Sequence, residues 1–143
     1  MDRALAEAHA AAERGEVPVG AVVVALDGTV LASAGNRTRE LRDPTAHAEV
    51  LAIRAACRHL DVERLSDCDL YVTLEPCPMC ATAISFARIR RLYYGAGDPK
   101  GGGVDHGPRI FSQPTCHHAP EVYGGIAESA AARLLVDFFS ERR

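Results

Sequence analysis

The spacing of apolar residues at the start of the chain predicts a helix followed by a β-hairpin. Residues 2–14 combine alanine-rich and charged positions with the period of an amphipathic helix. Residues 17–26 are rich in valine and almost entirely apolar, which is typical of a strand covered on both faces. The Asp27-Gly28 pair then predicts a tight turn, after which residues 29–34 return as an antiparallel strand. The apolar face of the helix is expected to contain Leu5, Ala8 and Ala12.

The rest of the chain alternates helices with strands. Asp43-Pro44-Thr45 is typical of a helix start, because Asp or Thr can cap the helix and proline is tolerated in its first turn. The expected elements are a helix over 46–59, a strand over 69–74, a helix over 78–86, strands over 91–95 and 121–125, and a helix over 126–141. The last helix is expected to bury Ala130, Leu134, Val136 and Phe138. This order predicts an α/β fold with three layers, α/β/α, around a mixed five-stranded sheet.

Length and composition indicate one folded domain. A chain of 143 residues can build one hydrophobic core but not two, so residues 1–143 are expected to form a single domain. Apolar residues make up 48% and the net charge is −3, which excludes an intrinsically disordered chain. No apolar run reaches the roughly 18 residues of a membrane span, and the charges mixed into residues 1–18 do not fit a signal peptide. Residues 96–120 form a long irregular loop, which in a compact domain is usually functional.

The five cysteines do not indicate a disulfide framework. Their number is odd, and only Cys77 and Cys80 have the spacing of metal ligands. We therefore expect a cytoplasmic protein that uses cysteine to bind a metal. Cys57 and Cys68 are most simply interpreted as small buried side chains.

A metal site is predicted from His47 together with Cys77 and Cys80. The two cysteines are three residues apart, so they share one face of a helical turn and both sulfurs can reach one ion. Both lie at a helix N-terminus, where unpaired N–H groups and the helix dipole favour the thiolate. Three protein ligands leave the fourth corner of a zinc tetrahedron open for water, which is the arrangement of catalytic zinc.

Glu49 is a candidate proton carrier for that site. In a regular helix, residues two apart point to nearly opposite sides, so His47 and Glu49 can serve one site only within the first turn. There the carboxylate could take a proton from water and deliver it to a ring nitrogen and a leaving amine. The competing interpretation is structural, because a glutamate in a first turn also stabilises the helix dipole.

His117 and His118 follow Cys116 and are a weaker metal candidate. Adjacent histidines rarely bind the same ion, so a packed or solvent-facing pair is the simpler interpretation.

The motifs carry a family resemblance. His47-Ala48-Glu49 followed by the segment 76–80, Pro-Cys-Pro-Met-Cys, resembles the signature of the cytidine and deoxycytidylate deaminase superfamily. Within it, the chain is similar nearly from end to end to the bacterial tRNA-specific adenosine deaminases. The similar segments are 16–22, 35–36, 45–49, 71–77, 88–91 and 137–139.

The resemblance implies both the fold and the chemistry. It implies a cytidine deaminase-like fold and one zinc ion per subunit, held by His47, Cys77 and Cys80. Zinc-bound hydroxide would attack C6 of the wobble adenosine in a tRNA anticodon, with Glu49 as the proton shuttle. Ammonia would leave and inosine would form. The family is a homodimer, and the partner subunit completes the active site.

The resemblance also implies residues that bind the substrate. Asn36 matches the family's asparagine that hydrogen-bonds the target nucleoside, although an asparagine after glycine is also a common turn residue. Ala48 is expected to contact the substrate as well. The acidic excess lies in residues 1–85, so a phosphate-rich tRNA is expected to meet mainly the more basic residues 86–143. The candidate RNA-contacting residues are Asp98, Lys100, Arg142 and Arg143.

Two other functions remain open at this point. The segments 101–107 and 111–114 depart from the commonest bacterial pattern, although they resemble one subgroup, and loops set substrate choice. The chain could therefore deaminate a free nucleobase such as guanine or cytosine. It could also be a non-catalytic, zinc-stabilised binding module, but such a site normally has a fourth protein ligand and the sequence offers none at convincing spacing.

Overall fold

The computed structural model describes residues 1–142. Within them, five strands form one mixed sheet in the order β2-β1-β3-β4-β5. The strands are β1 (Gly20–Val24), β2 (Val30–Gly35), β3 (Asp69–Leu74), β4 (Arg91–Ala96) and β5 (Glu121–Tyr123). β1 pairs antiparallel with both β2 and β3, whereas β3, β4 and β5 run parallel. The mixed five-stranded sheet is confirmed.

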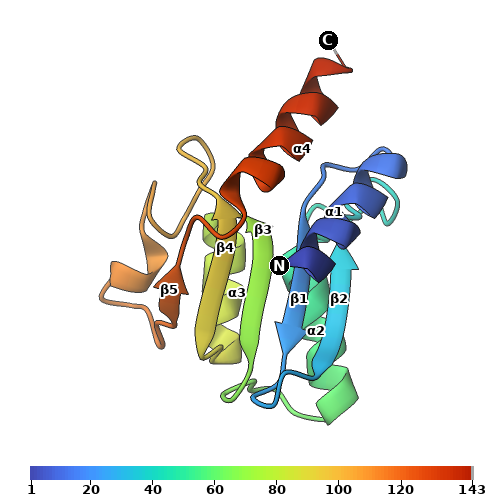
Figure 1. Ribbon diagram of the computed structural model, residues 1–143. Coiled ribbons are helices and arrows are strands. Elements are labelled where there is room, and N and C mark those ends of the chain that lie inside the picture. Colours follow the sequence, from blue (N-terminus) through green and yellow to red (C-terminus); the bar gives the residue numbers. More distant parts are fainter. Residues whose placement is uncertain (143) are drawn as a thin grey trace.

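Helices cover both faces of the sheet (Figure 1). The helices are α1 (Asp2–Glu13), α2 (Ala48–Leu60), α3 (Pro78–Ala87) and α4 (Glu128–Ser140), with a short 3-10 turn η1 (Ile110–Ser112). α2 and α3 lie behind the sheet in Figure 1, and α1 and α4 lie in front of it. This confirms the expected α/β/α layering. None of the helices in residues 1–142 combines the length and the apolar character that a membrane crossing requires.

α2 begins two residues later than the sequence pattern indicated. His47 is its N-cap, with an extended backbone (φ −74°, ψ 150°). The Asp43 carboxylate does not cap the helix, because it accepts hydrogen bonds from the backbone N–H and the hydroxyl of Thr45 at 2.9 and 2.7 Å. Asp43 therefore closes a turn before the helix, and the shift places His47 at the helix end itself.

The predicted buried face of α1 is partly correct, because Ala8 is buried as expected but the other two positions differ. Its buried side chains are Ala4, Ala8 and Ala11, whereas Leu5 and Ala12 are half-buried. The reason is a close backbone approach: a Cβ atom added at Gly20 of β1 would meet the Ala4 carbonyl oxygen at 1.9 Å. Only the smallest side chains fit where the helix lies directly on the strand.

The predicted buried face of α4 is only partly correct. Phe138 is buried and Leu134 is half-buried, but Ala130 is exposed and Val136 is 63% exposed. Ala131 takes the buried position near the start of the helix. The C-terminal half of α4 extends beyond the edge of the sheet in Figure 1, so it has less of the sheet to cover.

The main core lies between the sheet and the layer of α2 and α3. It contains Val23, Ala52, Ala56, Leu70, Val72, Ala81, Ile84 and Leu92, all 0% exposed. β3 ends at Leu74, and the chain passes through Glu75 and Pro76 directly into the N-cap of α3. The core therefore fixes the start of α3 at the carboxyl end of β3, next to the start of α2.

Candidate active site

Three potential metal ligands meet where α2 and α3 begin. His47 is the N-cap of α2, Cys77 is the N-cap of α3, and Cys80 lies in the first turn of α3. The Nδ1 atom of His47 lies 3.6 Å from the Cys77 sulfur and 3.4 Å from the Cys80 sulfur. The three ligand atoms all lie within 4.8 Å of one another. The structure thus brings together the set predicted from the sequence.

The spacing of these atoms fits zinc. Tetrahedral zinc with Zn–N bonds of about 2.0–2.1 Å and Zn–S bonds of about 2.3 Å places nitrogen and sulfur roughly 3.6 Å apart. The two nitrogen–sulfur distances of 3.6 and 3.4 Å agree with that separation. One imidazole and two sulfurs also form a donor set that zinc prefers, whereas Mg²⁺ and Ca²⁺ prefer oxygen ligands such as carboxylates.

The electrostatics of the site prepare one thiol for binding a cation. A hydrogen bond from the Cys80 thiol and one from the His47 imidazole hold the pKa of Cys77 at about 4. The same contact with Cys77, together with burial, raises the pKa of Cys80. The hydrogen bond with Cys77 raises the pKa of His47. Cys77 is therefore a thiolate at neutral pH, which is the form that coordinates metals.

Glu49 lies beside the ligands and is almost completely buried. It is the second residue of α2 and is 4% exposed. Because His47 is an extended N-cap and not part of the regular helix, both side chains can reach one site. Burial raises the pKa of the Glu49 carboxyl to about 7. A carboxyl group with a pKa near neutrality can both accept and return a proton.

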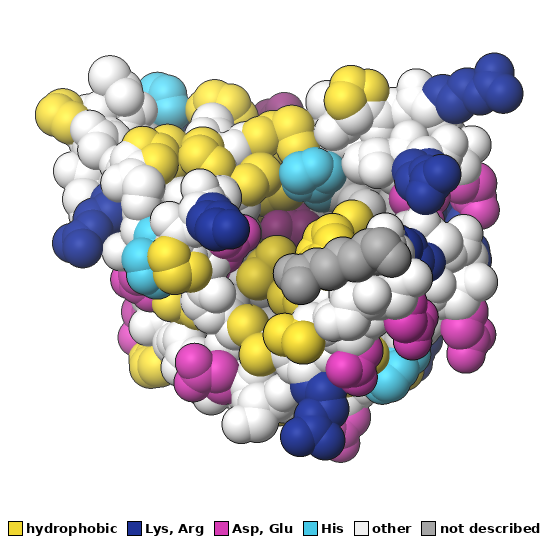
Figure 2. Space-filling view, turned by 90° about the horizontal axis from the view of Figure 1, so that it is seen from above, with side chains coloured by type: hydrophobic (Ala, Val, Ile, Leu, Met, Phe, Trp, Pro, Cys, Tyr) yellow, Lys and Arg dark blue, Asp and Glu magenta, His cyan; other side chains and the backbone are white. Residues whose placement is uncertain are grey.

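A cavity of about 330 Å³ opens next to the ligands. That volume falls in the range of small-molecule sites. It is lined by Val17, Val19, Asn36, Thr38, His47, Glu49, Leu74, Glu75, Cys77, Asp98 and Gly101. Figure 2 looks onto the end of the molecule where β3 and β4 terminate, and hydrophobic and acidic side chains lie at the bottom of a central depression. The cavity is thus a hollow with an apolar wall, an amide and several carboxylates.

The predicted substrate-binding residues lie in or beside this cavity. Asn36 lines it and is 7% exposed. Ala48 is 0% exposed, its side chain belongs to the core, and it is not among the residues that line the cavity. As the first residue of α2, it carries an N–H group that has no acceptor within the helix.

The candidate RNA-contacting residues are dispersed. Asp98 lines the cavity, but its carboxylate also accepts the backbone N–H groups of Lys100 and Gly101 at 3.1 and 2.9 Å. Lys100 is exposed and is not among the residues that line the cavity. The Arg142 guanidinium lies 3.5 Å from the centre of the Phe138 ring. Arg143 lies outside the described residues.

The second histidine pair fits the simpler interpretation of packed or solvent-facing side chains, because His118 is half-buried and His117 is exposed. The Nε2 atom of His118 lies 2.7 Å from the Ile89 carbonyl oxygen, and the His117 ring lies 5.8 Å from the Phe86 ring. Among residues 1–142, His47, Cys77 and Cys80 are the one group found with metal-ligand spacing.

Among the cavity-wall residues that the sequence analysis did not assign to the site, Glu75 is the one that carries a charge. Its side chain is 0% exposed and accepts hydrogen bonds from a loop 23–31 residues further along the chain. The available signal was local: an acidic residue stands between an apolar strand and the proline before Cys77, at a position where burial is expected.

Comparisons with known proteins place this site in a family context. The cytidine and deoxycytidylate deaminase zinc-binding region matches residues 1–96. The chain is 68% identical over 143 residues to the tRNA-specific adenosine deaminase of Agrobacterium fabrum, a match that covers 100% of this chain and 93% of that protein.

Two solved structures are also similar. One comes from studies of A-to-I editing by tRNA:A34 deaminases at the wobble position of transfer RNA; it matches with a TM-score of 0.93 and 68% identity over 94% of this chain and 97% of that one. A guanine deaminase of Bacillus subtilis matches with a TM-score of 0.67 and 34% identity over 99% and 90% of the two chains.

The ligand set can be tested by metal analysis. His47→Ala and Cys77→Ala are each expected to lose bound zinc and to unfold at lower urea concentration, because metal binding and folding are coupled. Cys57→Ala is the matched control, since Cys57 is a free cysteine outside the ligand group. Elemental analysis by mass spectrometry measures zinc per chain. Full zinc content in both ligand variants would contradict the assignment.

Proposed function

The chain belongs to the cytidine and deoxycytidylate deaminase family. We propose that it removes the C6 amino group of the wobble adenosine in a tRNA anticodon by hydrolysis, which converts that adenosine to inosine. The observation that carries this proposal is the 68% identity, over the whole chain, to a tRNA-specific adenosine deaminase. The structural match at a TM-score of 0.93 supports the same substrate. Residues 1–143 act together as a single zinc-dependent deaminase domain.

His47, Cys77 and Cys80 hold the zinc ion in this proposal. Zinc, when bound, supplies a Lewis acid that lowers the pKa of water toward neutrality. The Cys77 thiolate and the second sulfur offset the charge of the cation, while the neutral imidazole adds none. The N-termini of α2 and α3 fix the three side chains, so the ligands need little rearrangement to close around an ion.

Glu49 carries the protons. The carboxylate accepts one from water as the water oxygen bonds to C6 of adenine, and it returns that proton to ring atom N1. The second proton of the water goes by the same route to the departing amino group, so the C6–N6 bond breaks and ammonia leaves. Burial of Glu49 suits this exchange, because a pKa near 7 makes both directions accessible at neutral pH.

The cavity walls select and orient the base. Asn36 is nearly buried and can both donate and accept hydrogen bonds, so it suits recognition of the nucleoside. Val17, Val19 and Leu74 provide the apolar surface against which a purine ring can lie. The backbone N–H of Ala48 offers a further donor at the start of α2. The target base must leave its stack in the anticodon loop to reach this position.

A homodimer belongs to the same proposal. The outer side of α3 carries apolar side chains at the surface, with Phe86 60% and Met79 36% exposed. Together with Pro78, Thr82 and Ala83 they line a shallow hollow that a second copy of the chain could fill. A tRNA substrate also suits a cytoplasmic enzyme.

The substrate can be tested directly. The purified zinc-loaded protein is incubated with an anticodon stem-loop that bears wobble adenosine, and separately with guanine, cytosine and adenine. Inosine is expected in the stem-loop, and the free bases are expected to remain unchanged. Chromatography of nuclease digests measures inosine. Turnover of a free base with an unmodified stem-loop would replace this proposal with the free-base alternative.

Glu49→Gln is expected to keep its zinc and its fold but to lose about 100- to 10,000-fold in kcat, because the amide cannot carry the proton. Single-turnover deamination of the stem-loop and zinc analysis of the same sample give the two readouts. Glu63→Gln is the control, since Glu63 is exposed and lies in the loop that follows the C-terminal end of α2. A Glu49→Gln enzyme with unchanged turnover would remove Glu49 from the reaction.

The dimer can be tested by sedimentation velocity. Phe86→Glu places a charge on the proposed interface and is expected to shift the protein toward the monomer. Val136→Glu is the matched control, because Val136 is 63% exposed on α4, outside the proposed interface. Equal sedimentation of the two variants as dimers would exclude the outer face of α3 as the interface.

A further inference from the structure

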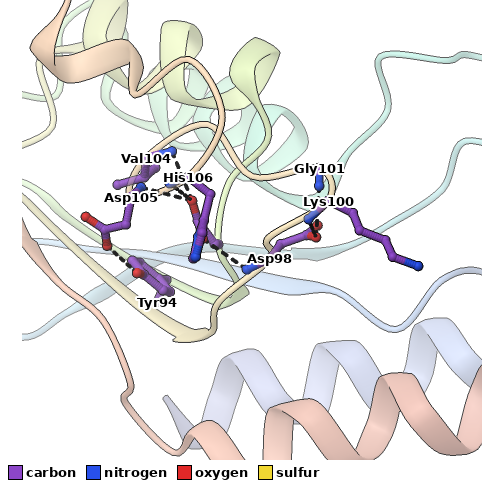
Figure 3. A network of polar contacts seen from close by, with 8 residues as sticks. Tyr94, Asp98, Lys100, Gly101, Val104, Asp105 and His106 are labelled. Atoms are coloured by element: carbon purple, nitrogen blue, oxygen red, sulfur yellow. Dashed lines mark hydrogen bonds and ion pairs between the residues drawn. The ribbon is translucent and has the colours of Figure 1, made fainter.

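The buried carboxylate of Glu75 accepts hydrogen bonds from one loop, whose residues Asp98, Val104, Asp105 and His106 are labelled in Figure 3. Its Oε1 atom accepts the backbone N–H of Asp98 at 3.0 Å and lies 2.6 Å from Nδ1 of His106. Its Oε2 atom accepts the backbone N–H groups of Val104, Asp105 and His106 at 3.1, 2.9 and 3.1 Å. The segment 98–106 therefore wraps around a single side chain.

These contacts fix the chemical state of the pair. Burial acts to raise the pKa of the Glu75 carboxyl, but the hydrogen bonds from the backbone N–H groups and from His106 outweigh burial and lower this pKa, so Glu75 accepts as a carboxylate. The fifth contact, at 2.6 Å, then requires a proton on Nδ1 of His106. A carboxylate whose oxygens accept five donors is a strongly held anchor, because each charge-assisted hydrogen bond is stronger than a neutral one.

The loop held by Glu75 forms part of the active site. Asp98 and Gly101 line the same cavity as Glu49 and Cys77. A Cβ atom added at Gly102 would meet the Glu75 Oε2 atom at 2.4 Å, and one at Gly103 would meet the Pro78 nitrogen at 2.6 Å. The loop thus fits tightly between the anchor and the start of α3, with no room for side chains at those positions.

We propose that Glu75 is a positioning residue for the substrate: with Nδ1–H of His106, it holds the 98–106 loop so that Asp98 and Gly101 form the cavity wall. This inference rests on the proposed function. It assigns Glu75 and His106 to the geometry of substrate binding and leaves the proton chemistry to Glu49. Loss of the anchor therefore weakens substrate binding more than it slows the reacting complex.

In a Glu75→Gln variant, the donor and acceptor atoms of the new amide group determine which hydrogen bond to the loop is lost. The amide oxygen can still accept the three N–H groups that meet Oε2. The amide NH₂ then faces the Asp98 N–H, which is a donor against a donor, while His106 can adapt by moving its proton to Nε2. The tether at Asp98 is lost, and Asp98 is the residue that lines the cavity.

His106 gives the sharper kinetic test, because one variant keeps a donor at the position of Nδ1 and another removes it. In His106→Asn the side-chain nitrogen is three bonds from Cα, as Nδ1 is in histidine, so it can donate to Glu75. His106→Ala cannot. For the stem-loop, His106→Ala is expected to raise KM roughly tenfold with kcat changed less than about twofold, whereas His106→Asn stays within about threefold of the parent in KM. His59→Ala, an exposed histidine, is the control.

The kinetic outcomes decide the role of His106. A fall in kcat with unchanged KM would overturn the positioning role. Equal KM values for the alanine and asparagine variants would show that the Nδ1 donor is not the cause. Zinc analysis of every variant confirms one ion per chain, so that loss of metal is not mistaken for loss of substrate binding.

Amide hydrogen exchange gives a readout that needs no substrate. In the parent protein the N–H groups of Asp98, Val104, Asp105 and His106 are expected to exchange slowly. In Glu75→Gln the Asp98 amide is expected to exchange at least tenfold faster. An unchanged exchange rate of the Asp98 amide in Glu75→Gln would contradict the role of Glu75 as the anchor of the loop.

The positioning role and the proposed function can be separated. If the parent protein deaminates guanine and not the stem-loop, the proposed tRNA substrate is wrong while the role of Glu75 stands. The same KM comparison is then made with guanine.

Discussion

The site depends on one constraint: two helices must begin near the carboxyl end of β3 so that the ligand atoms at their starts lie within 4.8 Å of one another. His47 and Cys77 are the N-caps of those helices, so their side chains project from the helix ends and not from the helix sides. Ala52 and Ala56 of α2 and Ala81 of α3 are 0% exposed in the core and allow close packing. Two positive helix ends repel each other, and the Cys77 thiolate between them offsets that repulsion.

Most of the fold could be predicted because its elements carry their own periodicity. β3 was predicted with its observed bounds, and the hairpin at Asp27-Gly28 forms as expected. The failures concern contacts between elements. The buried face of α1 is set by its approach to Gly20, and the exposure of Val136 is set by how far α4 extends past the sheet. Neither is encoded in the periodicity of the helix itself.

The residues of the site also fall into those that could be predicted from the sequence and one that could not. His47, Glu49, Cys77 and Cys80 could be predicted because metal chemistry restricts ligand types and spacing along the chain. Glu75 could not, because its partners lie 23–31 residues away in a segment without periodicity. A buried carboxylate that accepts backbone N–H groups leaves no pattern in the loop that donates them, since every residue except proline has such a group.

The charge of the cavity bears on how an RNA can be bound. Glu49, Glu75 and Asp98 all line the cavity, so a phosphate that entered it would meet several carboxylates. The hydrogen bonds that Glu75 and Asp98 accept do not remove their charge. An uncharged base is not repelled by these carboxylates, whereas the negatively charged phosphates of the RNA backbone are. The arrangement therefore suits a nucleotide that is turned outward from its strand, with the base inside the cavity and the phosphates outside it.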